Sequence, residues 1–231
     1  VVSMIEVIAR YFLYFIIYAF MGWLLEEIWH LIKLRKIVDR GFLIGPLCPI
    51  YGWGCVLIII LIGRNTSDAL AVFLKAIVVC SVLEYLTSYI MEKLFHARWW
   101  DYSDSRFNLN GRICLDTMIP FGILGCFVVY ILHPFVMGIV NILTMPWFYV
   151  VAGTIFIIYI IDNIISLNVM FNIKGQIHLE LKDSTEEMNE HVREWIKSKS
   201  LIYRRINGAY PNFKINKYII NKIKEHKSKT K

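Results

Sequence analysis

Apolar runs dominate this chain, and several approach or exceed the roughly 20 residues with which a helix crosses a hydrocarbon core about 30 Å thick. Only 19% of the 231 residues are charged, against about 25% in an ordinary soluble domain. Backbone polar groups within a bilayer must be paired internally, which helices achieve. We therefore predict an all-α, polytopic membrane bundle with five spans near residues 8–32, 43–62, 70–94, 113–140 and 147–170.

The distribution of Lys and Arg predicts the orientation of the bundle. Basic residues gather in the first connector, in the third connector and after Lys174, whereas the second connector holds only Arg64 and the fourth holds none. A five-span chain places the three basic segments on one side, and the positive-inside bias makes that side cytoplasmic. We expect the N-terminus outside and the C-terminus in the cytoplasm.

Two domains follow from this topology. Residues 1–171 form the transmembrane domain, and residues 172–231 form a cytoplasmic basic tail that is partly helical. Ile, Tyr and Phe are interleaved with Lys and Arg in the tail, a composition that favours contact with anionic membrane lipids. Charge alone would also permit nucleic-acid binding, but we expect no nucleic-acid partner.

A shift of 66 residues aligns two parts of the chain with the shared pattern E-x3-H-x9-R-x2-L-x-G-x2-C. Two spans separate the copies, so both have the same orientation, as in a duplicated helical hairpin followed by one helix. Chance identity in a compositionally biased chain is the alternative. The matching pairs are Glu26 with Glu92, His30 with His96, Arg40 with Arg106, Leu43 with Leu109, Gly45 with Gly111 and Cys48 with Cys114.

Acidic residues lie inside the predicted spans, with Glu84 near mid-membrane and Asp162 in the inner half of the fifth span. An ionisable group at a helix centre costs about 2.5 to 3.5 kcal/mol on insertion scales, so such groups face the bundle interior and have partners. One interpretation is that they pair with Arg or Lys from the connectors and lock helices together. The other is that they line a substrate or proton path.

Glu26 with His30, and Glu92 with His96, are i,i+4 pairs that each share one helix face. Two carboxylates and two imidazoles that met would suit a transition metal. The simpler interpretation is that a helix dipole favours His at the cytoplasmic end of a helix. We expect no metal site and no cofactor.

The second predicted span is dense in residues that interrupt a helix, namely Gly45, Pro46, Pro49, Gly52 and Gly54. Proline removes a backbone donor, and the freed groups are tolerated in a bilayer where protein or a water-filled cavity covers them. Broken helices often mark transporter binding sites. Close helix packing through the glycines is the alternative.

The connector between the third and fourth spans, EKLFHARWWDYSDSRFNLNGRIC over residues 92–114, is richer in polar residues than a simple link needs. Trp99, Trp100 and Tyr102 are expected at headgroup level. The arginines offer forks suited to phosphate or carboxylate, while Asp101, Asn108 and Asn110 are typical of side chains that order a loop through its own backbone. We predict an ordered loop that covers a cavity mouth or recognises an anionic group.

The blocks GWLLEEIWH, RGFLIGPLCPIYGWG, LEYLTSYIMEKLFHARWWDYS and NGRICL, within residues 15–134, resemble the Putative ABC-transporter type IV (CmpB-like) permease family of bacterial membrane proteins. The chain departs from the family pattern after GRICL at Asp116, Thr117 and Pro120. The resemblance implies a transport component in the bacterial cell membrane. An ABC system needs an ATPase, and these residues contain no G-x4-G-K-[ST] phosphate loop, so a separate ATPase subunit is implied.

Our leading hypothesis is a permease-like membrane component with a polar cavity open to the cytoplasm, working as a homodimer or with a partner subunit. The alternatives are a membrane enzyme that acts on lipid or envelope precursors, with Glu or His as general base, and a structural or regulatory subunit. The residues expected at the substrate site or cavity are Glu26, Arg40, Glu84, Ser88, Glu92, His96, Arg98, Trp100, Asp101, Asn108, Arg112 and Asp162.

Overall fold

The computed structural model describes residues 3–35, 41–63, 68–95, 97–179 and 214–215. Helices make up most of them, so the prediction of a mainly helical protein is confirmed. The helices are α1 (Met4–Leu34), α2 (Pro49–Ile62), α3 (Ala69–Phe95), α4 (Leu115–Phe127), the π-helix η1 (Val128–Leu132), α5 (His133–Ile142) and α6 (Trp147–Leu179). The short strands are β1 (Ala97–Arg98), β2 (Asn108–Leu109), β3 (Ile113–Cys114) and β4 (Lys214–Ile215).

Four helical stretches are long and apolar enough to cross a membrane: Met4–Lys33, Ala69–Phe95, Leu115–Ile142 and Trp147–Asn172. The second predicted span differs, because its helix α2 has only 14 residues and begins at Pro49. Residues 41–48 before it are not helical. The physical reason is local, since Pro46 and Pro49 supply no backbone N–H, and the Cys48 N–H donates to the Ala19 carbonyl of α1 instead.

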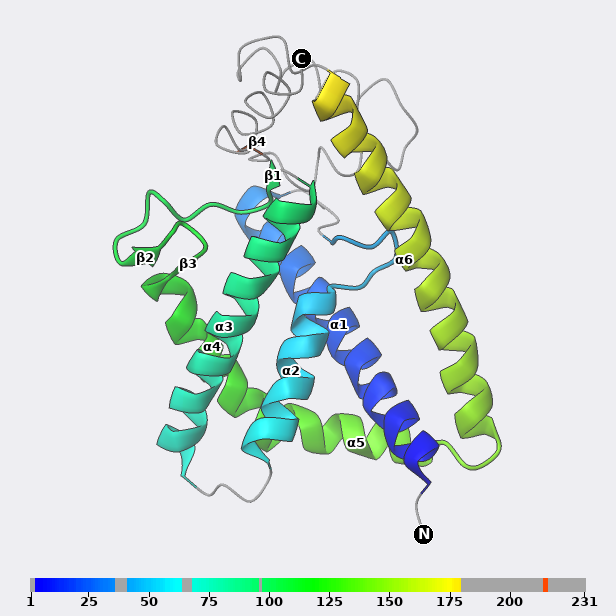
Figure 1. The fold of residues 1–231 in the computed structure, drawn as a ribbon. Helices are drawn as coiled ribbons and strands as arrows, with labels where there is room; N and C mark the ends of the chain where they lie inside the picture. The colour runs from blue at the N-terminus through cyan, green and yellow to red at the C-terminus, as the bar shows by residue number, and fades with distance from the viewer. Residues whose placement is uncertain (1–2, 36–40, 64–67, 96, 180–213, 216–231) are drawn as a thin grey trace.

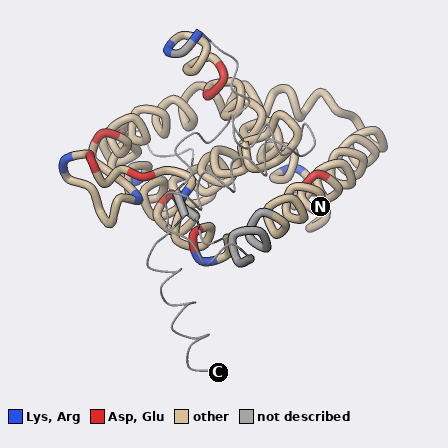
Figure 2. The backbone as a smooth tube through the Cα atoms, turned by 90° about the horizontal axis from the view of Figure 1, so that it is seen from above, with Lys and Arg blue, Asp and Glu red and all other residues tan. Residues whose placement is uncertain are grey.

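The helices alternate in direction between the two ends of the bundle (Figure 1). α1 begins at the lower end in Figure 1 and α6 ends at the upper end, where the connector between α3 and α4 also lies. Figure 2 shows that most of the described backbone carries no Lys, Arg, Asp or Glu, and that these residues are confined to a few short stretches. Arg35, Arg98 and Arg112 all belong to segments at the upper end.

Close helix contacts at small residues organise the core. α1 packs mainly on α2, and α3 packs mainly on α4. A Cβ added at Gly22 would overlap Tyr51 of α2, and one added at Gly125 would overlap Ala76 of α3. Small residues at such crossings let helix backbones approach closely within a membrane.

The fourth predicted span is divided, because α4 passes through η1 into α5, which lies across the lower end of the bundle in Figure 1. Pro134 has no N–H to continue the regular ladder, and π-helical turns are one way a helix absorbs such a disturbance. His133 is buried at the bend, and its Nδ1 lies 2.6 Å from the Tyr18 hydroxyl of α1. This contact fixes the bend against the centre of α1.

α6 lies at the edge of the bundle (Figure 1) and has the smallest buried share of the four candidate spans. It continues past its predicted end at Met170 to Leu179. β4, from the predicted basic tail, pairs antiparallel with β1 at the start of the α3–α4 connector. The other parts of the predicted basic tail, residues 180–213 and 216–231, lie outside the described residues.

Candidate polar site beneath the α3–α4 connector

Glu92, near the end of α3, binds two arginines of the connector that follows it. Its Oε2 lies 2.6 Å from Nη2 of Arg112 and 3.1 Å from Nε of Arg98. Arg112 also donates to the Ser88 hydroxyl at 3.2 Å, one turn earlier on α3. Its guanidinium lies over the rings of Tyr85 and Tyr89. Glu92 is only 3% exposed, and the two arginines compensate its charge.

The connector is ordered by its own polar side chains, as predicted for Asp101 and Asn108. The Asp101 carboxylate accepts from the N–H and hydroxyl of Ser103. Asn108 donates to the Ser105 carbonyl and accepts from the Gly111 N–H. Asn110 and Gly111 adopt positive φ angles of 56° and 67°, a conformation that suits these residue types in a tight turn.

Trp99 and Trp100 of the connector contact other parts of the protein, whereas Phe107 is exposed. The headgroup-level location of Trp99, Trp100 and Tyr102 stays a prediction. Trp99 is 6% exposed and packs against Phe95 and Phe42. Trp100 donates its indole N–H to the Arg112 carbonyl at 3.1 Å. Aromatic content alone did not predict these contacts, because the residues that Trp99 and Trp100 contact lie elsewhere in the chain.

Glu84, two turns before Glu92 on α3, is paired with a connector tyrosine and not with a cation. The Tyr102 hydroxyl donates to Glu84 Oε1 at 3.2 Å, while Oε2 is buried without a hydrogen-bond partner. The Thr117 hydroxyl lies near this carboxyl but donates to the Cys114 carbonyl at 2.9 Å. Within the described part of the chain, no Lys or Arg forms an ion pair with Glu84, so the ion-pair interpretation was wrong for this residue.

A second glutamate–tyrosine pair joins α1 to α2. The Tyr51 hydroxyl donates to Glu26 Oε1 at 2.6 Å, and His30 lies 3.7 Å from the other Glu26 oxygen. Burial, followed by the charge of Glu84 and a smaller effect of Glu26, raises the pKa of the Tyr102 phenol. We call these two glutamate–tyrosine pairs, together with Ser81 and with Ser88, Glu92, Arg98 and Arg112, the polar region.

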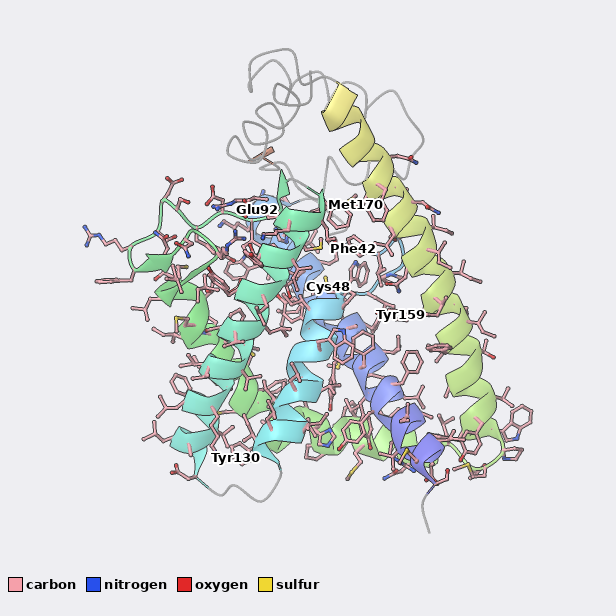
Figure 3. All side chains as sticks on the ribbon, in the orientation of Figure 1. Phe42, Cys48, Glu92, Tyr130, Tyr159 and Met170 are labelled. Carbon is pink, nitrogen blue, oxygen red and sulfur yellow. The ribbon has the colours of Figure 1, made fainter. Side chains whose placement is uncertain are left out.

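Asp162 of α6 binds backbone N–H groups of the irregular segment before α2, and no Lys or Arg among the described residues forms an ion pair with it. Its place in a substrate cavity stays a prediction. Its carboxylate accepts from Ile44 N at 2.8 Å and from Gly45 N at 2.9 Å. Ser166, one turn later, donates to the same carboxylate at 3.2 Å. Figure 3 shows Phe42, Cys48 and Tyr159 in the same region between α2 and α6. These hydrogen bonds connect α6 to the irregular segment that precedes α2.

Residues 13–167 match the family described as Putative ABC-transporter type IV. The matched range runs from α1 into α6 and includes both the polar region and the separate contact of Asp162 and Ser166 on α6. The chain belongs to this family. No curated protein and no solved structure matches it at a significant level.

In this member of the Putative ABC-transporter type IV family, the two copies of the pattern, which are 66 residues apart, agree at one backbone position but differ in their side-chain contacts. Cys48 and Cys114 occupy the N-cap positions of α2 and α4. Glu92 binds two arginines, whereas Glu26 binds a tyrosine and approaches a histidine. The equivalence supports a repeated hairpin at the level of the backbone.

Ten of the twelve predicted site residues lie in the described ranges, and Arg40 and His96 lie outside them. Eight of the ten gather around the connector or α1: Glu26, Glu84, Ser88, Glu92, Arg98, Trp100, Asp101 and Arg112. Asn108 orders the connector itself, and Asp162 acts at the separate α6 contact.

The four residues considered as an alternative metal site, Glu26, His30, Glu92 and His96, are not fully covered, because His96 is not described. Among the residues that are, no group of three or more His, Cys, Asp or Glu side chains is placed to hold a metal ion. His30 instead places its Nδ1 2.7 Å from the Glu26 carbonyl, within its own helix.

Sequence reasoning missed Tyr51, Tyr102 and Ser81 as members of the polar region. Tyr102 lies 18 positions after Glu84 and beyond the end of α3 at Phe95, so helical spacing cannot predict their contact. Ser81 carried a usable signal, because Ser81, Glu84, Ser88 and Glu92 follow one another at three- and four-residue intervals and so share one face of α3.

Proposed function

We propose that this protein is the membrane-embedded component of a transport system, a permease that receives its solute at the polar region beneath the α3–α4 connector. Membership of the Putative ABC-transporter type IV family and the four long apolar helices support a membrane transport role. The polar region supplies carboxylate, guanidinium and hydroxyl groups for solute binding, which a bundle of purely apolar side chains lacks.

One observation carries the proposal. A connector rich in charged and aromatic residues is held on α3 by the buried Glu92, beside two part-buried glutamate–tyrosine contacts, and one of its own tyrosines reaches the buried Glu84. A segment that only joined two helices would not need buried ionic contacts, which cost desolvation energy. We propose that the connector acts as a cover, and that the region below it opens as a cavity towards the cytoplasm.

The orientation of the cavity rests on the charge distribution. Arg35, Lys93, Arg98 and Arg112 belong to one end of the bundle, and positively charged loops are retained on the cytoplasmic side. The solute would therefore enter the polar region from the cytoplasm of the bacterial cell, or leave the polar region into the cytoplasm.

Energy would come from a separate ATPase subunit, because these 231 residues hold no phosphate-binding loop. We propose that the subunit docks at the same basic end, where ATP is available. With four long candidate spans and one short helix, the chain would complete its pathway as a homodimer or with this partner.

The test compares solute accumulation in three strains: one lacking the protein, one complemented with wild type, and one complemented with Arg112→Ala. Arg106→Ala is the matched control, since Arg106 is exposed in the same connector whereas Arg112 is buried. We expect at least one solute to differ between the first two strains, with Arg106→Ala resembling wild type and Arg112→Ala resembling the null. Identical solute profiles in all strains, with no ATPase in the purified complex, would refute the proposal.

A further inference from the structure

Two polar atoms on one face of α3 are buried without hydrogen-bond partners. They are Glu84 Oε2 and Ser81 Oγ, and the two residues are 7% and 5% exposed. Positions i and i+3 of a helix lie on the same face, so both oxygens belong to one buried environment. An unpaired carboxylate oxygen in such an environment is expensive, and this face of α3 carries two unpaired oxygens.

The surroundings of Glu84 favour positive charge. Tyr102 of the connector donates to Oε1, Thr117 of α4 lies nearby, and the thiols of Cys80 and Cys114 face the same region. Across the region, α1 contributes the acidic Glu26 and α2 contributes Tyr51.

No compensating cation reaches this carboxylate from the described residues. Arg98 and Arg112 are already bound to Glu92, and Arg98 also pairs with Asp101. The region around Glu84 therefore holds carboxylates and neutral oxygens, without a basic side chain in ion-pair contact.

We propose that Glu84, with the hydroxyls of Ser81 and Tyr102, forms a binding site for one small monovalent cation. Oxygen donors suit hard cations, and a proton satisfies the same requirement by neutralising the carboxylate. A buried ionisable residue in a membrane segment commonly marks an ion or proton site. The inference goes beyond the proposed transport function and does not depend on it, because ion binding is measured on the purified protein alone.

The experiment follows the melting temperature of purified wild-type protein in detergent. Sodium chloride replaces N-methylglucamine chloride at constant ionic strength, and each series is run at several pH values between about 5 and 9, where side chains of shifted pKa titrate. Glu84→Gln is the test variant. Asp116→Asn is the matched control, because it makes the same carboxylate-to-amide change at an exposed position.

A sodium site predicts that saturating sodium raises the wild-type melting temperature by about 5 to 10 °C, an effect that Glu84→Gln loses and Asp116→Asn keeps. A proton site predicts no sodium effect. The wild type then loses melting temperature as the pH rises, because the proton bound by the folded state is released, and Glu84→Gln lacks that loss. Identical responses of wild type and Glu84→Gln to both variables would overturn the proposal.

Tyr102→Phe keeps the test decisive if Glu84→Gln does not fold. It removes one donor to the carboxylate and leaves the carboxylate itself in place. A sodium site then loses one of its three proposed oxygen ligands and weakens by about tenfold, which corresponds to about 1.4 kcal/mol. A proton site holds its proton to higher pH, because the anion has lost a stabilising donor. The absence of both shifts in Tyr102→Phe would also overturn the proposal.

Discussion

Arg112 Nη2 lies 2.6 Å from Glu92 Oε2, and both side chains are buried. Glu92 belongs to the last turn of α3, and Arg112 comes three residues before α4. The pair therefore closes the connector onto the helix that precedes it. Because Arg98 reaches the same oxygen, the connector is part of the bundle, and its position is set by buried charge.

Arg112→Met should destabilise the protein by about 3 to 5 kcal/mol, because it removes the closer of the two cations that face a buried carboxylate. Arg98→Met is the matched control, since the Arg98 side chain is more exposed, at 24% against 10% for Arg112. Its loss should be smaller. Denaturant titrations in detergent micelles measure both, and equal losses would contradict the ranking.

The double variant Glu92→Gln with Arg112→Met should recover part of the stability lost by Arg112→Met alone. Glutamine carries no charge, so the uncompensated buried carboxylate is gone. The same titrations test this coupling. A double variant whose loss equals the sum of the two single losses would mean that the residues do not interact.

Asp162→Asn should loosen α6 from the interrupted helix. An amide offers one acceptor oxygen where the carboxylate offers two, so either the Gly45 N–H loses its partner or the Ile44 N–H keeps only the Ser166 hydroxyl. A buried unsatisfied donor costs about 1 to 3 kcal/mol. We expect a lower melting temperature and faster proteolysis near residues 41–48, with the exposed Asp116→Asn as control. Unchanged proteolysis would show that this contact does not hold the segment.

Glycine-to-alanine changes should separate the packed helix crossings from the open helix surfaces. Alanine at Gly22 or Gly125 would overlap Tyr51 or Ala76 and force the helices apart, at about 1 to 3 kcal/mol. Gly138 and Gly153 have open space around them, so alanine there should be neutral or slightly stabilising, because it is the better helix former. Melting temperatures of the four variants check this. Similar values for all four would contradict the observed packing.

Local patterns in the sequence were enough to predict the helical segments. Apolar length located α1, α3 and α6, and the proline and glycine pattern around Gly45 and Pro49 indicated where the second helix is interrupted. Turn chemistry at Asp101 and Asn108 also indicated an ordered connector. These features depend on residues that are close to one another in the chain, so they can be predicted from a single sequence.

Contacts between distant elements could not be predicted in the same way. Glu84 pairs with Tyr102, and Asp162 with the backbone at Ile44, where paired cations were one expectation. Tyr102 lies beyond the end of α3 and Ile44 belongs to a non-helical segment, so helical periodicity predicts neither contact. A backbone N–H is also supplied by every residue type except proline. The bend at His133 was missed because Pro134 is tolerated in many membrane helices.

The proposed orientation predicts opposite labelling of the two ends of the bundle. In a background without native cysteines, Thr144→Cys should react with an impermeant thiol reagent in intact cells, and Ser103→Cys should react only after the cells are opened. Both positions are exposed and lie at opposite ends (Figure 1). Labelling of Ser103→Cys in intact cells would reverse the orientation.

Glu84→Gln tests most directly the central claim, that the polar region beneath the connector takes part in transport. The amide keeps the size and the hydrogen bond to Tyr102, so the protein should fold with a melting temperature within about 2 to 4 °C of wild type in sodium-free buffer. Solute accumulation in cells should fall to the level of the strain lacking the protein. Wild-type accumulation by Glu84→Gln at equal expression, or a large loss of melting temperature that alone explains the defect, would contradict the account.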